Sequence, residues 1–222
     1  MKRRDLIQLV EKRGQRYSEV LGINVNSGED REAFKWFLAS VLFGAPITES
    51  AVLKTYRCFE KHRILTPKKI VETGWNGLVD ILDEGGYTRY DHKTTDKLLM
   101  VMANLESRYG GSITRLHNEA SDPRDLENRL KQLGKGIGDV TVSIFLRELR
   151  GIWSKANPTP TPLVIEAAKT LDVVQSETPE EALCELERFW KENAVKGKSF
   201  VNFEAALLRF GKEMRRKKRA ES

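Results

Sequence analysis

The chain has 222 residues, a formal net charge of +6, 40% hydrophobic residues and 32% charged residues. This composition is typical of a folded globular protein and excludes a disordered chain. No apolar run approaches the roughly 20 residues of a membrane span, and the N-terminus lacks the features of a signal peptide. We therefore expect a cytoplasmic protein. Cys58 and Cys184 are too few for a disulfide framework, a structural zinc site or an iron–sulfur cluster, and buried thiols are expected.

Apolar residues recur at helical spacing along nearly the whole chain. Capping signals mark the starts of several helices, such as Thr66 followed by Pro67, and Asp122 followed by Pro123. No segment alternates with period two, so an all-α chain of about ten helices is predicted. The predicted helices cover residues 3–13, 30–43, 49–59, 67–74, 75–86, 91–108, 123–133, 140–150, 162–171, 178–194 and 199–218.

A glycine-rich segment, LGKGIGDV, interrupts the helical pattern between residues 133 and 140. Because glycine costs a helix interior roughly 1 kcal/mol relative to alanine, Gly134, Gly136 and Gly138 predict a tight turn or a close backbone approach. Ile137 is expected to point inward, and Asp139 to cap the second helix.

The same segment would expose backbone N–H groups at a helix start, where the helix dipole favours an anion. Lys135 adds a positive charge at the edge of the turn. The glycines alone fit either a phosphate-binding hairpin or a plain turn between two helices.

The excess positive charge is concentrated near the C-terminus, where Lys212 to Arg219 hold six basic residues and one acidic residue. Lys217, Lys218 and Arg219 are candidate contacts to a polyanion through counterion release. The alternative is a tail that only solubilises the terminus.

Three blocks in order resemble one family. The segment LENRLKQLGKGIGDVTVSIFLREL is similar to the helix-hairpin-helix of the DNA glycosylases related to endonuclease III and the adenine glycosylases. FKWFLASVLFGAPITESAV is similar to the family's first barrel helix and following loop, and GGYTRYDHKTTDKLLMVMANL to its Gly-x-Tyr-x-x-Lys-Ala helix. The resemblance covers about residues 30–172.

The resemblance implies two helical domains with a DNA-binding cleft between them. Residues 34–153 would form a six-helix barrel containing the hairpin, residues 126–149, while residues 1–33 and 154–222 would form the second domain. A target nucleotide would be flipped out of double-stranded DNA into the cleft. The implied DNA-backbone contacts are Gly134, Lys135, Gly136, Ile137, Gly138 and Thr141.

The family also sets expectations for bound groups and location. The hairpin carbonyls are a candidate site for a monovalent cation, whereas no metal site built from side chains and no iron–sulfur cluster is expected. The protein is expected to be a monomer that associates with the nucleoid when bound to DNA.

Two family positions carry other residues here. The lysine of bifunctional members aligns with Val140, and valine cannot form a Schiff base. The aspartate of monofunctional members aligns with Thr161, or with Thr159 as the neighbouring choice. Losing that carboxylate beside a developing oxocarbenium ion should raise the barrier by several kcal/mol.

Other residues could contribute to the site. Pro46 takes the place of a wedging glutamine and could enter a base step, or it could simply end a helix. Tyr87, Tyr90 and His92 could line a base pocket, or the tyrosines could be packing residues. Glu166 and Asp172 are weak substitutes for the missing aspartate, because each fits a solvated helix charge or a cap equally well.

The sequence therefore favours a DNA glycosylase-like protein of base-excision repair that acts on damaged or mispaired bases, without lysine-based lyase activity. The alternatives are a catalytically inactive relative that binds damaged or structured DNA, and an unrelated helical interaction protein. The catalytic residue is not identified.

Overall fold

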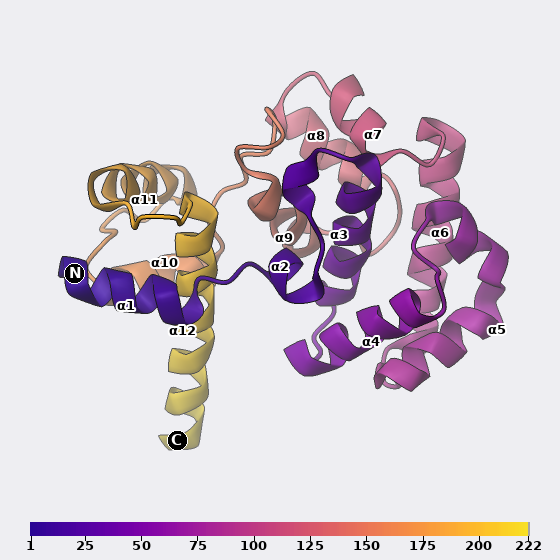
Figure 1. Cartoon of the computed structure of the whole chain (residues 1–222), viewed down its shortest axis with the longest axis horizontal. Helices are drawn as coiled ribbons and strands as arrows, with labels where there is room; N and C mark the ends of the chain where they lie inside the picture. The colour runs from indigo at the N-terminus through magenta and orange to yellow at the C-terminus, as the bar shows by residue number, and fades with distance from the viewer. Residues whose placement is uncertain (222) are drawn as a thin grey trace. The chain divides into compact units, whose positions relative to one another are not determined.

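The computed structural model describes residues 1–221, and its regular secondary structure in that range is helical (Figure 1). The only strand-type pairing among those residues is an isolated bridge between Arg150 and Trp153, so the predicted all-α class is confirmed. The helices are α1 Arg3–Arg13, α2 Tyr17–Leu21, the 3-10 helix η1 Val25–Ser27, α3 Asp30–Phe43, α4 Glu49–Lys61, α5 Pro67–Gly85, α6 Asp91–Tyr109, α7 Ile113–Glu119, α8 Pro123–Lys131, α9 Asp139–Leu149, α10 Pro162–Thr170, α11 Pro179–Asn193 and α12 Phe200–Glu221.

The chain forms two compact units. Unit 1 consists of Met1–Val20 and Pro158–Ser222, and unit 2 of Leu21–Asn157. The N-terminal boundary thus falls earlier than the sequence suggests, because the segment before α3 packs on α3. Its Ile23 is buried, and Glu32 of α3 accepts the backbone N–H of Asn24 at 2.9 Å.

Local capping chemistry places most helix starts where the sequence predicts them. Thr48, Thr66 and Asp122 each accept a backbone N–H three residues later, at 3.3, 3.2 and 2.9 Å. The two helices predicted on either side of residue 74 are both present within α5, which is broken at Gly74 by a non-helical backbone with φ +69° and ψ 179°. The short α2 and α7 were not predicted, because each offers too few turns for a clear period.

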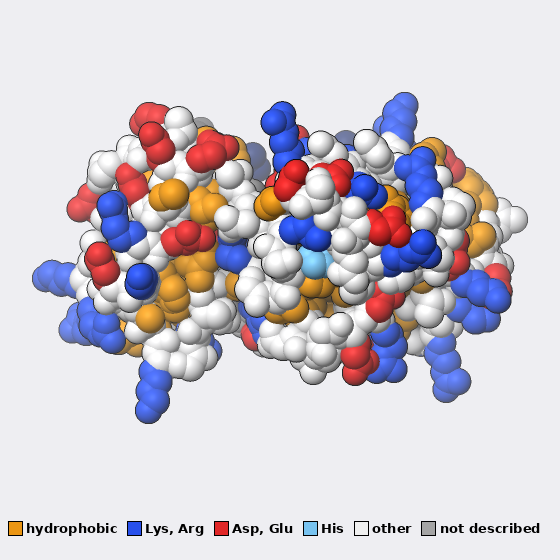
Figure 2. Space-filling view, turned by 90° about the horizontal axis from the view of Figure 1, so that it is seen from above, with side chains coloured by type: hydrophobic (Ala, Val, Ile, Leu, Met, Phe, Trp, Pro, Cys, Tyr) orange, Lys and Arg blue, Asp and Glu red, His pale blue; other side chains and the backbone are white. Residues whose placement is uncertain are grey.

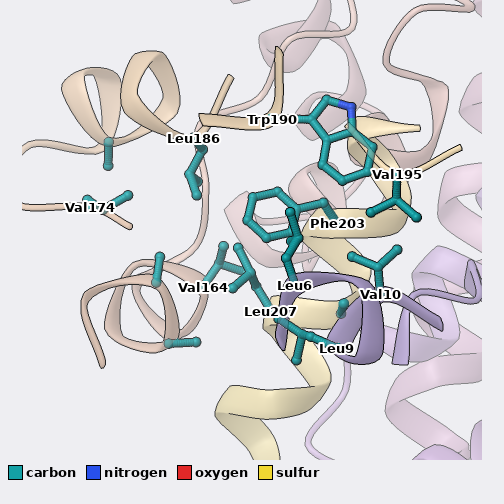
Figure 3. Packing of buried hydrophobic residues seen from close by; sticks show 14 residues of the cluster. Leu6, Leu9, Val10, Val164, Val174, Leu186, Trp190, Val195, Phe203 and Leu207 are labelled. Atoms are coloured by element: carbon teal, nitrogen blue, oxygen red, sulfur yellow. The ribbon is translucent and has the colours of Figure 1, made fainter. Parts of the chain in front are cut away.

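Unit 1 has its own hydrophobic core, made by α1, α10, α11 and α12 (Figure 3). Phe203 of α12 stacks on Trp190 of α11 with ring centroids 5.5 Å apart, and Leu6 of α1 is fully buried in the same cluster. The first half of α12 is packed in this core. The basic last turns of α12 extend beyond the core (Figure 1).

Unit 2 is organised around α3, which is buried along most of its length. Trp36 donates its indole N–H to the carbonyl of Phe145 in α9 at 3.0 Å, and Phe37 meets the Phe145 ring edge-on at 5.2 Å. The packing of α3 on α9 sets the loop after α3 close to the start of α9. α5 and α6 lie side by side in the same unit (Figure 1).

The cysteines only partly match the expectation of two buried thiols. Cys58 is buried in α4, but Cys184 is exposed on α11. Among residues 1–221, no group of three or more His, Cys, Asp or Glu side chains could hold a metal ion. Over the same range, no helix is both long enough and apolar enough to cross a bilayer.

Candidate nucleic-acid interface

The glycine-rich segment forms a tight corner between α8 and α9, and we call Gly134 to Gly138 the glycine corner. The N–H of Gly134 donates to the Lys131 carbonyl at 3.4 Å, and the N–H of Ile137 donates to the Gly134 carbonyl at 3.1 Å. Ile137 is buried, as predicted, and so anchors an otherwise exposed turn.

The three glycines differ in whether the fold itself requires them. A Cβ at Gly134 would lie 2.9 Å from Val101 Cγ2, so this glycine permits close packing of the corner on α6. Gly136 has φ +94°, a conformation that L-residues with side chains rarely adopt. Gly138 has φ −108°, and a Cβ there would meet nothing within 4 Å. Only Gly138 lacks an internal reason to be glycine, which is expected where the backbone must approach a ligand.

Two side chains of α6 donate hydrogen bonds to backbone carbonyls just before the glycine corner. Asn104 Nδ2 donates to the Leu133 carbonyl at 2.8 Å, and Arg108 Nη1 donates to the Gln132 carbonyl at 3.1 Å. The Arg108 guanidinium thus brings positive charge to the Gln132 carbonyl. The monovalent cation site at the hairpin carbonyls stays a prediction.

The start of α9 has no side-chain cap, because its N-cap residue is Gly138. The predicted cap, Asp139, is instead the first helical residue, and its side chain is 91% exposed. Its carboxylate turns across the hairpin to Lys131 Nζ at 2.5 Å. Within residues 1–221, the first-turn N–H groups of α9 are therefore left for an outside acceptor, and Lys131 offsets the negative charge of Asp139.

Thr141 occupies this first turn, but its side chain is turned inward and only 2% of the residue is exposed. A Cβ at Gly44 would lie 2.2 Å from Thr141 Oγ1, so the end of α3 and the start of α9 are in close contact. Thr141 can therefore offer a ligand its backbone N–H but not its hydroxyl.

A surface pocket of about 550 Å³ opens beside the corner, and we call it the α6 pocket. The loop after α3, one face of α6 and the glycine corner together form its walls. Pro46 is exposed at this pocket, as a wedge residue would need to be.

Only one of the three predicted base-pocket residues lines the α6 pocket, namely Tyr90. Tyr87 is fully buried, its hydroxyl donates to the Leu42 carbonyl, and burial raises its pKa. Of the two alternatives for Tyr87, the packing residue is the one observed, because its phenol adds a donor to the Leu42 carbonyl from inside the core, where the N–H of Ala45 also reaches that carbonyl at 3.3 Å. His92 lies outside the pocket, with its ring 4.9 Å from that of Trp75.

The pocket also contains residues that the sequence did not single out, above all Lys93 and Lys97 of α6. Burial lowers the pKa of Lys97. The missed signal was helical spacing, since Tyr90, Lys93, Lys97 and Met100 follow one another at intervals of three or four residues.

The two family catalytic positions offer no reactive group. Val140 lies in the first turn of α9 and is 61% exposed, but its side chain carries no amine that could form a Schiff base. Thr161 is the N-cap residue of α10, as the register predicts, but its side chain makes no capping hydrogen bond. Within the described residues, its Oγ1 is buried without a hydrogen-bond partner. The neighbouring choice, Thr159, is exposed.

The substitute carboxylates are held by other side chains of unit 1. Glu166 accepts from Arg215 at 2.8 Å and lies 3.5 Å from Lys218 Nζ, and these cations lower its pKa. Asp172 accepts from Gln175 Nε2 at 2.7 Å. Each is thus positioned by a partner within its own unit.

The basic tail is helical and forms the last turns of α12. Lys217, Lys218 and Arg219 are exposed there. On the face seen in Figure 2, basic and acidic side chains are interspersed. The tail, by contrast, is a concentrated positive segment, with six basic residues and one acidic residue from Lys212 to Arg219.

Comparison with known proteins bears on the fold. No protein-family model matches the chain, and no curated protein matches its sequence. Among solved structures, the chain is similar to the 3-methyladenine DNA glycosylase MagIII of H. pylori bound to 1,N6-ethenoadenine, with a TM-score of 0.56 and 18% identity over 83% of this chain and 85% of that chain. The chain has a helical DNA glycosylase fold. At this identity the similarity shows the architecture alone.

Proposed function

We propose that this protein is a DNA-binding, DNA glycosylase-like protein of base-excision repair, which takes a damaged or mispaired base out of double-stranded DNA. The observation that carries the proposal is the glycine corner. It presents an uncapped helix start, with open space at Gly138, on a fold shared with a DNA glycosylase.

The corner would bind the sugar–phosphate backbone. A phosphate oxygen is a strong acceptor for the first-turn N–H groups of α9, and the helix dipole favours its charge. Lys135, exposed at the corner, adds positive charge to it. These contacts position the duplex without reading its sequence.

Base release would proceed without a covalent lysine intermediate at the family position, because that residue is Val140. A negative group near the developing oxocarbenium ion would stabilise the transition state of hydrolysis. Glu166 and Asp172 are the candidates from the sequence, and the ionised state of Glu166 suits that electrostatic role.

A panel of duplexes carrying alkylated, oxidised, deaminated or mispaired bases tests the proposal, with binding and base release measured separately. An active protein should release at least one of these bases, and Glu166→Gln or Asp172→Asn should slow that release. Binding to none of the duplexes would refute the proposal.

A catalytically inactive, damage-binding protein is the second candidate. It is favoured by Thr161, which stands at the expected aspartate position and whose buried hydroxyl has no partner within residues 1–221, and by the ion pair of Glu166 with Arg215. The same panel separates the two, since this candidate predicts selective binding with no base release.

Both candidates share the remaining expectations, which are a monomer bound to double-stranded DNA and nucleoid association. Borohydride should trap no adduct with abasic DNA at position 140, and sedimentation with and without duplex measures the stoichiometry.

A further inference from the structure

The α6 pocket combines positive charge with apolar surface. Three lysines line it, Lys93, Lys97 and Lys135, against one carboxylate, Asp96. That carboxylate is already engaged, because Asp96 Oδ1 accepts the indole N–H of Trp75 at 2.9 Å. The pocket therefore has an excess of positive charge.

Lys97 is the most unusual of these lysines. Its stem packs over the corner, since a Cβ at Gly136 would lie 2.9 Å from Lys97 Cε. It is half-buried, yet within the described residues it forms no ion pair or hydrogen bond, and burial alone lowers its pKa. An ammonium that is partly removed from water without a partner is unfavourable, and a bound anion would relieve this.

The opposite wall is apolar and includes an aromatic ring. Ala45 and Pro46 come from the loop after α3, while Tyr90 and Met100 come from either end of the lining face of α6. Met100 is 44% exposed, although methionine is usually buried. The volume of about 550 Å³ lies within the range of small-ligand sites.

We propose that the α6 pocket binds one nucleotide unit of a DNA strand, with its phosphate on Lys97 and its base against Pro46, Tyr90 and Met100. This inference rests on the proposed function, since it gives the bound strand a second point of attachment. The site is separate from the N–H groups of α9, because it lies on the α6 side of the corner. A free nucleoside monophosphate offers the same chemistry.

Lys97→Met tests the phosphate contact, and Lys54→Met is the matched control, because Lys54 is exposed on α4 outside the pocket. Each variant removes one positive charge and keeps a flexible stem. Lys97→Met should fold at least as stably as the parent protein, which thermal unfolding checks.

In the first arm, fluorescence anisotropy measures duplex affinity at several salt concentrations. Lys97→Met should weaken binding about tenfold, the lower end for a hydrogen bond to a charged group, and should reduce the salt slope by about 0.9. Lys54→Met should change the affinity and the salt slope less than Lys97→Met does. Equal behaviour of the two variants would overturn the proposal.

In the second arm, amide chemical shifts are followed while deoxyadenosine monophosphate, inorganic phosphate or deoxyadenosine is added to the full chain. The monophosphate should shift residues of the α6 pocket, more than either fragment does, and Lys97→Met should abolish the effect. Equal shifts from inorganic phosphate would refute the base contact, and shifts confined to other regions would refute the site.

The two arms separate this inference from the proposed function. If the parent protein binds no duplex but the monophosphate still shifts the pocket, the proposed function fails and the nucleotide site stands. If duplex binding depends on Gly138 but not on Lys97, the pocket proposal fails alone.

Discussion

Gly138 offers the sharpest test of how the protein would hold DNA, because its backbone can accept a side chain without cost to the free protein. Its φ of −108° is ordinary, and a Cβ would meet nothing within 4 Å. Asn and Asp are preferred N-cap residues, so Gly138→Asn and Gly138→Asp should each stabilise the fold by a few tenths of a kcal/mol.

The same substitutions should weaken DNA binding. The new side chain accepts a first-turn N–H of α9 and fills the space in front of it, which removes at least one hydrogen bond to a phosphate. Such a bond contributes about 1.5–3 kcal/mol, or roughly 10- to 150-fold in affinity. A carboxylate about 5 Å from a phosphate adds about 1 kcal/mol of repulsion in water, so Gly138→Asp should bind about fivefold more weakly than Gly138→Asn.

Anisotropy with a labelled duplex at fixed salt measures the affinities, and urea unfolding measures the stabilities. Gly28→Asn is the matched control, since Gly28 is also exposed with open space around it and its φ of +72° suits asparagine. Parent-like affinity in both Gly138 variants would refute the reasoning, as would an affinity loss that the control shares.

Three further substitutions test the packing behind the site. Gly44→Ala should cost about 1–3 kcal/mol of unfolding free energy by overpacking against Thr141, and adding Thr141→Ala should recover part of it, as a double-mutant cycle would show. Tyr87→Phe should cost about 0.5–1.5 kcal/mol in urea unfolding, because it removes the buried hydrogen bond from the phenol while the Leu42 carbonyl keeps the N–H of Ala45. Arg215 lowers the pKa of Glu166, so the stability from this pair is present above the pKa of the unfolded-state carboxyl and lost as the pH falls through the folded-state value. The parent protein and Glu166→Gln should therefore converge in stability at low pH, and a constant difference would contradict the assignment.

Local signals in the sequence predicted the helices well, because caps act within a few residues. Thr66 and Asp122 each accept a nearby N–H, so their neighbours alone decide where α5 and α8 begin. Ile137 was predicted to be buried from its place between two glycines. The same locality explains the error at Asp139, whose carboxylate is drawn to Lys131 across the hairpin.

The rest of the site depends on contacts between distant segments, which no local pattern encodes. Tyr87 is buried because the end of α3 offers it a carbonyl. Gly134 is a packing glycine only because Val101 lies beneath it. In the sequence, Lys97 cannot be distinguished from an exposed lysine. Its partial burial depends on the packing of the glycine corner against its stem. The sequence therefore predicts the glycine corner. The roles of its glycines and the α6 pocket depend on tertiary contacts, which only the structure shows.

Amide hydrogen exchange at the start of α9 tests the central claim most directly. Exchange at Gly138, Asp139 and Val140 is measured by NMR with and without duplex DNA, with the amides of α11 as an internal reference. The account predicts that DNA slows exchange at these three positions well beyond any change in α11. Unchanged exchange there, while DNA protects other parts of unit 2, would contradict it.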